Sequence, residues 1–254
     1  MLYAGIDIGS TTSKCVLLRD GEIVGSTLVD TGIGTGGPEQ AFSGALAAAG
    51  VRSDEITRCV ATGYGRTSWK GADETISELA AHARGSHFLL PSTRTVIDIG
   101  GQDAKVIALG PGGRMVNFAM NDKCAAGTGR FLEVMATILR VPIQSLEELA
   151  AQAQRPAPIS STCTVFAESE VISQLAAGTP ISDVVAGICM SVASRVAALA
   201  KRVGIEQEVC MSGGVAQNGG VRRALERALE IPIFYAPQAQ MAGALGAALY
   251  ACHK

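Results

Sequence analysis

Residues 7–14 read Asp-Ile-Gly-Ser-Thr-Thr-Ser-Lys, and residues 98–103 read Asp-Ile-Gly-Gly-Gln-Asp. Each stretch comes at the end of an apolar segment, residues 2–8 in one case and 95–99 in the other, which reads as a buried strand. The first aspartates of the two stretches lie 91 residues apart, which is too far for a solenoid repeat. The repetition therefore predicts two copies of an α/β lobe.

A predicted β-hairpin follows each stretch. Its strands are expected at residues 13–18 and 22–29 in the first half, and at residues 105–109 and 114–118 in the second. Asp20-Gly21 is a strong turn signal in the first hairpin, and Pro111-Gly112-Gly113 separates the strands of the second. Because a chance recurrence of Asp-x-Gly in a glycine-rich chain would not repeat the hairpin, duplication is the better interpretation.

The duplication also suggests where the lobes divide. We expect a first lobe over residues 1–92 and a second over residues 93–254, with the last helix, at about residues 242–252, packing back near the first lobe. Another helix is predicted over about residues 75–84. The fold class expected is α/β.

Composition and charge narrow the range of functions. The 254-residue chain carries 21 basic and 23 acidic residues, so it has no excess of positive charge for binding nucleic acid. No apolar run free of charge reaches the roughly 18 residues of a membrane helix, because the longest candidate, residues 184–200, contains Arg195. The N-terminus lacks the features of a signal peptide. We therefore expect a cytoplasmic protein without a nucleic-acid or membrane partner.

The two repeated stretches have the composition of phosphate-binding loops. Glycine lets backbone N–H groups approach phosphate oxygens, and the hydroxyl groups add further donors. We expect Asp7 and Asp98 to lie near Mg²⁺ through water, and Gln102 to orient an attacking water. A third glycine turn, at residues 212–218, would leave space for a base and ribose. The predicted nucleotide-binding residues are Gly9, Ser10, Thr11, Thr12, Lys14, Gly100, Gly101, Gly213, Gly214, Val215 and Asn218.

These three turns and the small-residue stretch at 241–248 resemble the phosphate-1, phosphate-2, adenosine and second-connection motifs of the acetate/sugar kinase, Hsp70 and actin superfamily. The resemblance implies duplicated ribonuclease H-like lobes with a nucleotide cleft between them. It also implies that Gly243 and Gly246 permit two helices to cross closely.

The chain has seven cysteines and no CxxC motif, so reduced thiols or metal ligands are expected. Cys15, Cys59, Cys189 and Cys210 lie in apolar patterns and are predicted to be buried, and Cys252 is a tail residue. Cys124 and Cys163 each precede a predicted helix, whose N-terminus would stabilise a thiolate or an anionic cluster. A 4Fe–4S cluster needs four ligands, so a two-fold dimer is the simple solution, while an incidental role for both cysteines is the alternative.

Four more motifs point to one family. They are residues 61–66 (Ala-Thr-Gly-Tyr-Gly-Arg), 121–131 (Asn-Asp-Lys-Cys-Ala-Ala-Gly-Thr-Gly-Arg-Phe), 163–170 (Cys-Thr-Val-Phe-Ala-Glu-Ser-Glu) and 211–218 (Met-Ser-Gly-Gly-Val-Ala-Gln-Asn). With the two repeated stretches they resemble the ATP-dependent activators (component A) of 2-hydroxyacyl-CoA dehydratases, which are related to the ATPase subunits of benzoyl-CoA reductase.

The resemblance implies an oxygen-sensitive homodimer that hydrolyses ATP. Cys124 and Cys163 of both chains would hold one 4Fe–4S cluster, and the helices after them would point at it. A reduced ferredoxin or flavodoxin would supply the electron, which ATP-driven movement of the lobes would pass to a partner iron–sulfur enzyme. That partner would be a 2-hydroxyacyl-CoA dehydratase, a benzoyl-CoA-type reductase or a double-cubane cluster protein.

Two alternatives come from other classes. A small-molecule kinase, such as a type III pantothenate kinase, would need a carboxylate base, for which Asp103 or Asp122 could serve. A kinase has no need for two helix-initiating cysteines. A non-enzymatic module similar to Hsp70 or actin would need a peptide-binding domain or polymer contacts.

Overall fold

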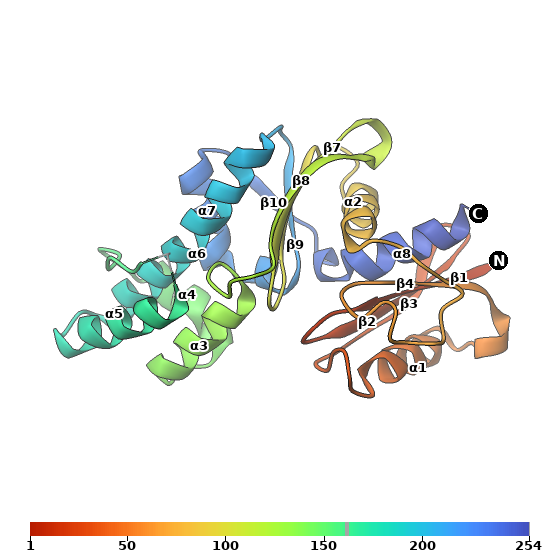
Figure 1. The fold of residues 1–254 in the computed structure, drawn as a ribbon, viewed down its shortest axis with the longest axis horizontal. Coiled ribbons are helices and arrows are strands. Elements are labelled where there is room, and N and C mark those ends of the chain that lie inside the picture. Colours follow the sequence, from red (N-terminus) through yellow and green to blue (C-terminus); the bar gives the residue numbers. More distant parts are fainter. Residues whose placement is uncertain (161–162, 254) are drawn as a thin grey trace. The chain divides into compact units, whose positions relative to one another are not determined.

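The computed structural model describes residues 1–160 and 163–253 and divides the chain into two compact units (Figure 1). Unit 1 comprises Met1–Val96, Leu109–Val116 and Ala236–Lys254, and unit 2 comprises Ile97–Ala108 and Asn117–Tyr235. The units differ in their bounds from the two continuous ranges expected from the sequence, because the chain after Tyr235 returns to pack on the first sheet.

Unit 1 is built on a five-stranded sheet in the order β3-β2-β1-β4-β5. Its strands are β1 (Leu2–Ile8), β2 (Ser13–Arg19), β3 (Glu22–Val29), β4 (Ile56–Thr62) and β5 (Glu74–Thr75). β2 runs antiparallel to β1 and β3, and β4 runs parallel to β1. The register of β1 with β2 sets Asp7 opposite Lys14, so the two ends of the first repeated stretch lie side by side.

Helices cover both faces of this sheet (Figure 1), with α1 (Gly37–Ala49) on one face and α8 (Ala242–Cys252) on the other. Successive residues of a strand point to opposite faces, and β2 follows this rule. Cys15 and Leu17 pack in the cluster that contains Ala41 and Ala45 of α1. Val16 and Leu18 pack in the cluster that contains Leu245 of α8.

The chain enters the helix α2 (Glu78–Leu89) later than the sequence predicts. Instead of starting the helix at residue 75, Glu74–Thr75 form β5, which pairs in parallel with β4. Ser77 then acts as the N-cap, since its hydroxyl accepts a hydrogen bond from the Ala80 backbone N–H at 3.2 Å. The predicted helix over residues 75–84 was therefore wrong in both bounds.

The second sheet repeats the strand order of the first. Its order is β10-β9-β6-β7-β8, so from the β8 edge it again reads third, second, first, fourth, fifth. The strands are β6 (Thr95–Ile99), β7 (Ala104–Leu109), β8 (Met115–Asn121), β9 (Val209–Ser212) and β10 (Ile233–Tyr235). The repeated order confirms the duplicated α/β architecture.

Unit 2 carries the remaining helices, which are α3 (Gly129–Leu139), α4 (Leu146–Ala151), α5 (Thr164–Ala176), α6 (Ile181–Val203) and α7 (Gly219–Leu229). One apolar core joins Ile97 and Ile99 of β6 to Phe131 of α3 and Ile188 of α6. By length and composition α6 could cross a membrane, but 78% of its apolar window is buried inside the structure, as in a core helix.

Two glycines allow α2 and α8 to cross at backbone distance. A Cβ atom added at Gly246 of α8 would lie 1.8 Å from the Ala81 carbonyl oxygen of α2. A Cβ atom added at Gly85 of α2 would lie 1.9 Å from the Ala242 carbonyl oxygen of α8. The close crossing therefore depends on the absence of side chains at Gly85 and Gly246, as the small residues of the last helix predict.

We expect Gly246→Ala to lower the free energy of unfolding by about 3 kcal/mol or more, because the new methyl group would force α8 away from α2. Urea unfolding followed by circular dichroism measures this loss. Gly36→Ala is the matched control, since its added Cβ would meet only the Gln40 side chain, at 3.5 Å. Equal stability of the two variants would contradict the close crossing.

Candidate functional site

The first glycine loop (residues 9–12) joins β1 to β2 in unit 1. The Gly9 N–H donates to the Thr12 carbonyl at 2.9 Å, and the Gly9 carbonyl accepts from the Ile33 N–H at 2.9 Å. The hydroxyl-bearing residues Ser10, Thr11 and Thr12 are half-buried. Beside the loop, Lys14 Nζ lies 3.3 Å from Asp7 Oδ2. The ion pair neutralises a carboxylate that is only 5% exposed.

The turn at residues 61–66 encloses Asp7. Gly63 has φ +87°, and an added Cβ there would lie 2.4 Å from Asp7 Oδ1. The Gly65 N–H donates to the Ile8 carbonyl at 2.8 Å, and Arg66 Nη1 donates to the Gly63 carbonyl at 3.0 Å. These contacts give the Ala-Thr-Gly-Tyr-Gly-Arg motif a physical role, because they fix Asp7 and the end of β1. In the sequence, the two glycines of this motif, Gly63 and Gly65, were the signal that could have identified this turn.

The second glycine loop (residues 100–103) joins β6 to β7 and lies in unit 2. The Gly100 N–H donates to the Asp103 carbonyl at 2.9 Å, as Gly9 does to Thr12 in the first loop. Gln102 is exposed at this loop, while Gly101 is half-buried. Both glycine loops therefore have the same backbone closure.

Asp98, at the end of β6, is held from two sides. Lys105 Nζ lies 3.1 Å from Asp98 Oδ2 and 2.7 Å from Asp103 Oδ2. The Ser212 hydroxyl donates to Asp98 Oδ1 at 2.8 Å. Because Asp98 and Lys105 are 2% and 3% exposed, the pairing of these charges is a condition for burying them.

Lys105 is a site residue that the sequence reasoning did not select. In both repeats Asp-Ile-Gly is followed by four residues and then by lysine, which gives Asp7 with Lys14 and Asp98 with Lys105. Both pairs are ion pairs in the structure. The shared spacing was the signal that could have identified Lys105.

The third glycine turn follows β9 and begins a 3₁₀ helix, Gly214–Gln217. Gly213 has φ +81°, and an added Cβ there would lie 2.3 Å from the Ile99 carbonyl oxygen, so this position requires glycine. Gly214 is exposed, and Val215 is buried. The Asn218 side chain accepts a hydrogen bond from the Val221 N–H at 3.1 Å, which makes it the N-cap of α7.

Cys124 lies in the turn between β8 and α3, which we call the Cys124 turn (residues 122–128). The sequence predicts that the N-terminus of the following helix serves this cysteine, and here the prediction was wrong. α3 begins five residues later, and its Gly129 and Arg130 N–H groups donate to the carbonyls of Gly100 and Gly101, at 2.8 and 2.7 Å. The helix start thus serves the second glycine loop.

Cys163, in contrast, is the N-cap residue of α5 and has extended backbone geometry. Its carbonyl accepts the Ala167 N–H at 3.0 Å, which closes the first turn of the helix. Val165 and Phe166, in that turn, are 66% and 63% exposed. Cys163 therefore lies at a helix start, beside exposed apolar side chains.

The seven cysteines form two groups by burial. Cys124, Cys163 and Cys252 are half-buried, whereas Cys15, Cys59, Cys189 and Cys210 are buried, as predicted. Burial raises the pKa of the Cys59 and Cys189 thiols to about 12, and raises that of Cys15 as well. Thiols with such pKa values remain protonated and unreactive near neutral pH.

Cys124 and Cys163 belong to no group of three or more metal-ligand side chains (His, Cys, Asp or Glu) within the described part of one chain. The two cysteines border α3 and α5, which pack against each other. Two half-buried cysteines per chain would give a 4Fe–4S cluster two of its four ligands, so a second copy would have to supply two more.

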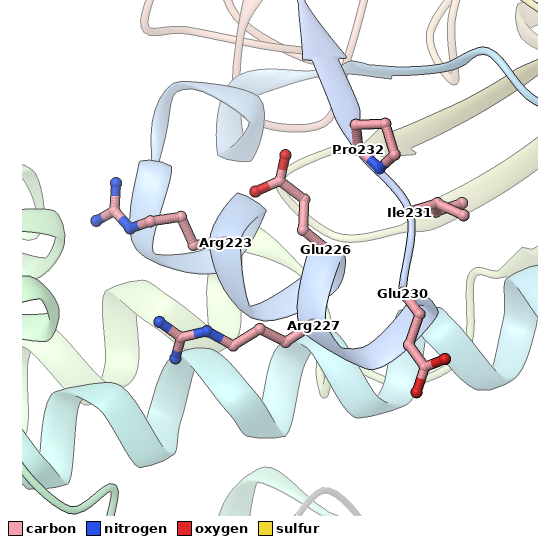
Figure 2. A pocket seen from close by; sticks show the side chains of 6 residues that line it. All are labelled: Arg223, Glu226, Arg227, Glu230, Ile231 and Pro232. Carbon is pink, nitrogen blue, oxygen red and sulfur yellow. The ribbon is translucent and has the colours of Figure 1, made fainter.

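A pocket of about 530 Å³ lies elsewhere, at the end of α7 (Figure 2). Its lining residues are Arg223, Glu226, Arg227, Glu230, Ile231 and Pro232. Arg223 pairs with Glu147 at 3.1 Å, and Glu226 accepts the Ile233 N–H at 3.1 Å, so these charges stabilise the ends of α7. The Gly219 N–H, which donates to Glu147, lowers the pKa of that carboxyl. No predicted site residue lines this pocket.

The whole chain is similar to proteins of known activity. Residues 4–251 match the model of the BadF/BadG/BcrA/BcrD ATPase family. The (R)-2-hydroxyglutaryl-CoA dehydratase activating ATPase of Acidaminococcus fermentans is 58% identical over 252 residues, which cover 98% of this chain and 96% of that protein.

Solved structures agree with this similarity. The activator of the 2-hydroxyisocaproyl-CoA dehydratase from Clostridium difficile, with bound ADPNP, has a TM-score of 0.96 and 52% identity, covering 99% of this chain and 94% of that one. A glucokinase of the ROK family from Streptomyces griseus is 15% identical, with a TM-score of 0.58 and coverage of 100% of both chains. The glucokinase shows a likeness of fold alone, which agrees with the expected α/β fold of two repeated lobes.

We expect Lys105→Met to lower the free energy of unfolding by about 3 kcal/mol or more, because it leaves Asp98 buried without its counter-charge. Urea unfolding measures the loss. Lys14→Met is the matched variant in the first repeat. Lys14→Met should lower the free energy of unfolding by less than Lys105→Met does, because Lys14 is more exposed and pairs with one carboxylate, whereas Lys105 pairs with two. An equal or larger loss for Lys14→Met would contradict the expectation that the more deeply buried ion pair contributes more to the free energy of unfolding.

Proposed function

We propose that this chain, which belongs to the BadF/BadG/BcrA/BcrD ATPase family, couples ATP hydrolysis to the transfer of single electrons to an iron–sulfur enzyme. The enzyme it activates would be a dehydratase of the 2-hydroxyacyl-CoA type. One observation carries this proposal. The second glycine loop is hydrogen-bonded to the start of α3, directly after a turn with an accessible cysteine. The proposed phosphate-binding loop and the proposed cluster ligand would thus be connected through the start of α3.

ATP binding is assigned to the three glycine turns. The hydroxyl groups of Ser10, Thr11 and Thr12 and the backbone N–H groups around Gly9, Gly100 and Gly101 would donate to phosphate oxygens. Gly213, Gly214, Val215 and Asn218 would border the base and ribose. Lys14 adds a positive charge beside the first loop, where it also pairs with Asp7.

Hydrolysis, ATP and water to ADP and phosphate, is assigned to the two aspartates and Gln102. Asp98 already accepts from Ser212 and Lys105, so it would hold Mg²⁺ through the water molecules of the ion. Asp7 would act in the same way from the first repeat. Gln102 is exposed at the second glycine loop, and its side-chain amide would orient the attacking water.

Cys124 and Cys163 of two chains would together hold one 4Fe–4S cluster, which supplies one-electron transfer at low potential when bound. The accessible thiols are suited to this role, and the exposed Val165 and Phe166 supply apolar surface for a second copy of the chain. We therefore propose a cytoplasmic, oxygen-sensitive homodimer. A reduced ferredoxin or flavodoxin would be the donor, and a benzoyl-CoA-type reductase or a double-cubane cluster protein would be alternative acceptors.

The kinase alternative has no free base among its candidates. Asp103 is bound to the buried Lys105 at 2.7 Å, and Asp122 pairs with Lys123 at 3.1 Å on the surface. A carboxylate that is held by a buried lysine is a poor acceptor for the proton of a substrate hydroxyl. The geometry therefore favours the activator over a small-molecule kinase.

The cluster assignment predicts the metal content of protein purified without oxygen. Two chains should contain about four iron atoms and four acid-labile sulfides. Cys124→Ser and Cys163→Ser should each lose them, and Cys252→Ser is the matched control, because Cys252 is also half-buried. Colourless, iron-free protein that hydrolyses ATP and resists reconstitution would contradict the proposal.

The role of Asp98 predicts the effect of Asp98→Asn on ATP hydrolysis. Loss of an outer-shell carboxylate should reduce phosphate release by about 10- to 100-fold while leaving the iron content unchanged. A phosphate-release assay at saturating Mg²⁺ and ATP measures this. Unreduced hydrolysis, or unreduced ATP-dependent reduction of the partner enzyme, would exclude Asp98 from the coupling.

A further inference from the structure

The Cys124 turn is a small hydrogen-bonded unit. Asn121, the last residue of β8, donates from its side-chain amide to the carbonyls of Cys124 and Ala126, at 2.9 and 3.1 Å. The Thr128 hydroxyl and N–H both donate to the Ala125 carbonyl, at 2.7 and 3.0 Å. The backbone of Cys124 is thus fixed to the end of β8 by one side chain, Asn121.

The downstream end of the Cys124 turn is hydrogen-bonded to the second glycine loop, and its upstream end follows a strand beside β7. On its upstream side, β8 lies beside β7 in the sheet, and β7 starts at Ala104, directly after the loop. On its downstream side, the Gly129 and Arg130 N–H groups donate to Gly100 and Gly101. A Cβ atom added at Gly129 would lie 3.1 Å from the Gly100 carbonyl oxygen, so there is little free space between the start of α3 and the glycine loop. A shift of Gly100 and Gly101 must therefore displace the start of α3.

Residues 154–160, which lie upstream of Cys163, have a different anchor, the core helix α6. The Ser191 hydroxyl of α6 donates to the Ser160 carbonyl at 2.8 Å. The Ala157 N–H donates to the Asp183 carbonyl at 2.8 Å, and the Asp183 side chain accepts the Gln154 N–H at 2.8 Å. Glu170 of α5 accepts the Ser160 N–H, which ties the same segment to the helix that Cys163 begins.

Close packing reinforces this second anchor. A Cβ added at Gly187 of α6 would lie 2.2 Å from the Ala157 carbonyl oxygen, so the segment rests directly on the helix backbone. The Cys124 turn also contacts α6, where Gly127 lies beside the aliphatic part of Arg195. That contact is van der Waals packing against a side chain, which can move more easily than a backbone hydrogen bond.

From these contacts we infer that the nucleotide acts on Cys124 and that Cys163 is held still. In each chain the second glycine loop would shift the Cys124 turn, while α6 holds residues 154–160 in place and, through Glu170, the helix α5 that Cys163 begins. Asn121 is then a positioning residue, because it transmits the displacement of β8 and α3 to the backbone of Cys124. This inference rests on the proposed function and adds to it the route by which ATP regulates the cysteine ligands.

The experiment compares both cysteines in iron-free, reduced protein. Alkylation by iodoacetamide is followed for Cys124 and Cys163 separately by mass spectrometry, with and without Mg²⁺ and ADPNP. In the wild type, ADPNP should change the rate at Cys124 by at least about fivefold and the rate at Cys163 by less than about twofold. In Asn121→Leu, which removes both donors at similar volume, the response of Cys124 should fall below about twofold.

Ser191→Ala is the matched control, because it removes the hydrogen bond from α6 to Ser160. It should alter the rate at Cys163 and leave the nucleotide response of Cys124 intact. Thr128→Val, which removes the hydroxyl bond to Ala125, tests the same turn in case Asn121→Leu does not fold.

The inference is overturned if ADPNP, shown by calorimetry to bind, changes both cysteines equally or changes neither. It is also overturned if Asn121→Leu or Thr128→Val keeps the full response of Cys124. Failure of the proposed function is a separate result, since iron analysis of the wild type measures it. Protein without a cluster but with a selective Cys124 response would refute the proposed function and support the route.

Discussion

The buried carboxylate of Asp98 links three neighbouring strands, and the second and third glycine turns follow these strands. Asp98 belongs to β6, its partner Lys105 to β7, and its partner Ser212 to β9. Separating these groups would leave a buried charge without the ion pair and the hydrogen bond that offset its loss of hydration. The loops at residues 100–103 and 213–218 begin directly after these strands. Their positions relative to each other therefore depend on this one network.

Within unit 2, the second glycine loop is also connected to the Cys124 turn. Gly100 and Gly101 accept the first N–H groups of α3, and α3 directly follows the Cys124 turn. Cys163 depends on another element, because its preceding segment is bonded to α6 in the apolar core. In the proposed function, the first property would let the nucleotide act on Cys124, and the second would keep the Cys163 side of the redox site in place.

Much of this arrangement can be predicted from the sequence, because local signals determine it. The two Asp-Ile-Gly stretches, with their hairpins, predict the duplicated sheet, and the apolar patterns predict the four buried cysteines. The predictions that were wrong concern features that depend on tertiary contacts. The N-terminus of α3 is taken by Gly100 and Gly101, so it cannot serve Cys124. The start of α2 was misplaced because β5 pairs with β4 and Ser77 caps the helix after it.

The central claim is that one cluster, shared by two chains, responds to the nucleotide bound by those chains. Electron paramagnetic resonance of the dithionite-reduced protein, with and without Mg²⁺ and ADPNP, tests both parts at once. The account predicts the signal of one reduced 4Fe–4S cluster per two chains and a change in its spectrum when ADPNP binds. A missing signal, or a spectrum that ADPNP leaves unchanged while it is bound, would contradict the account.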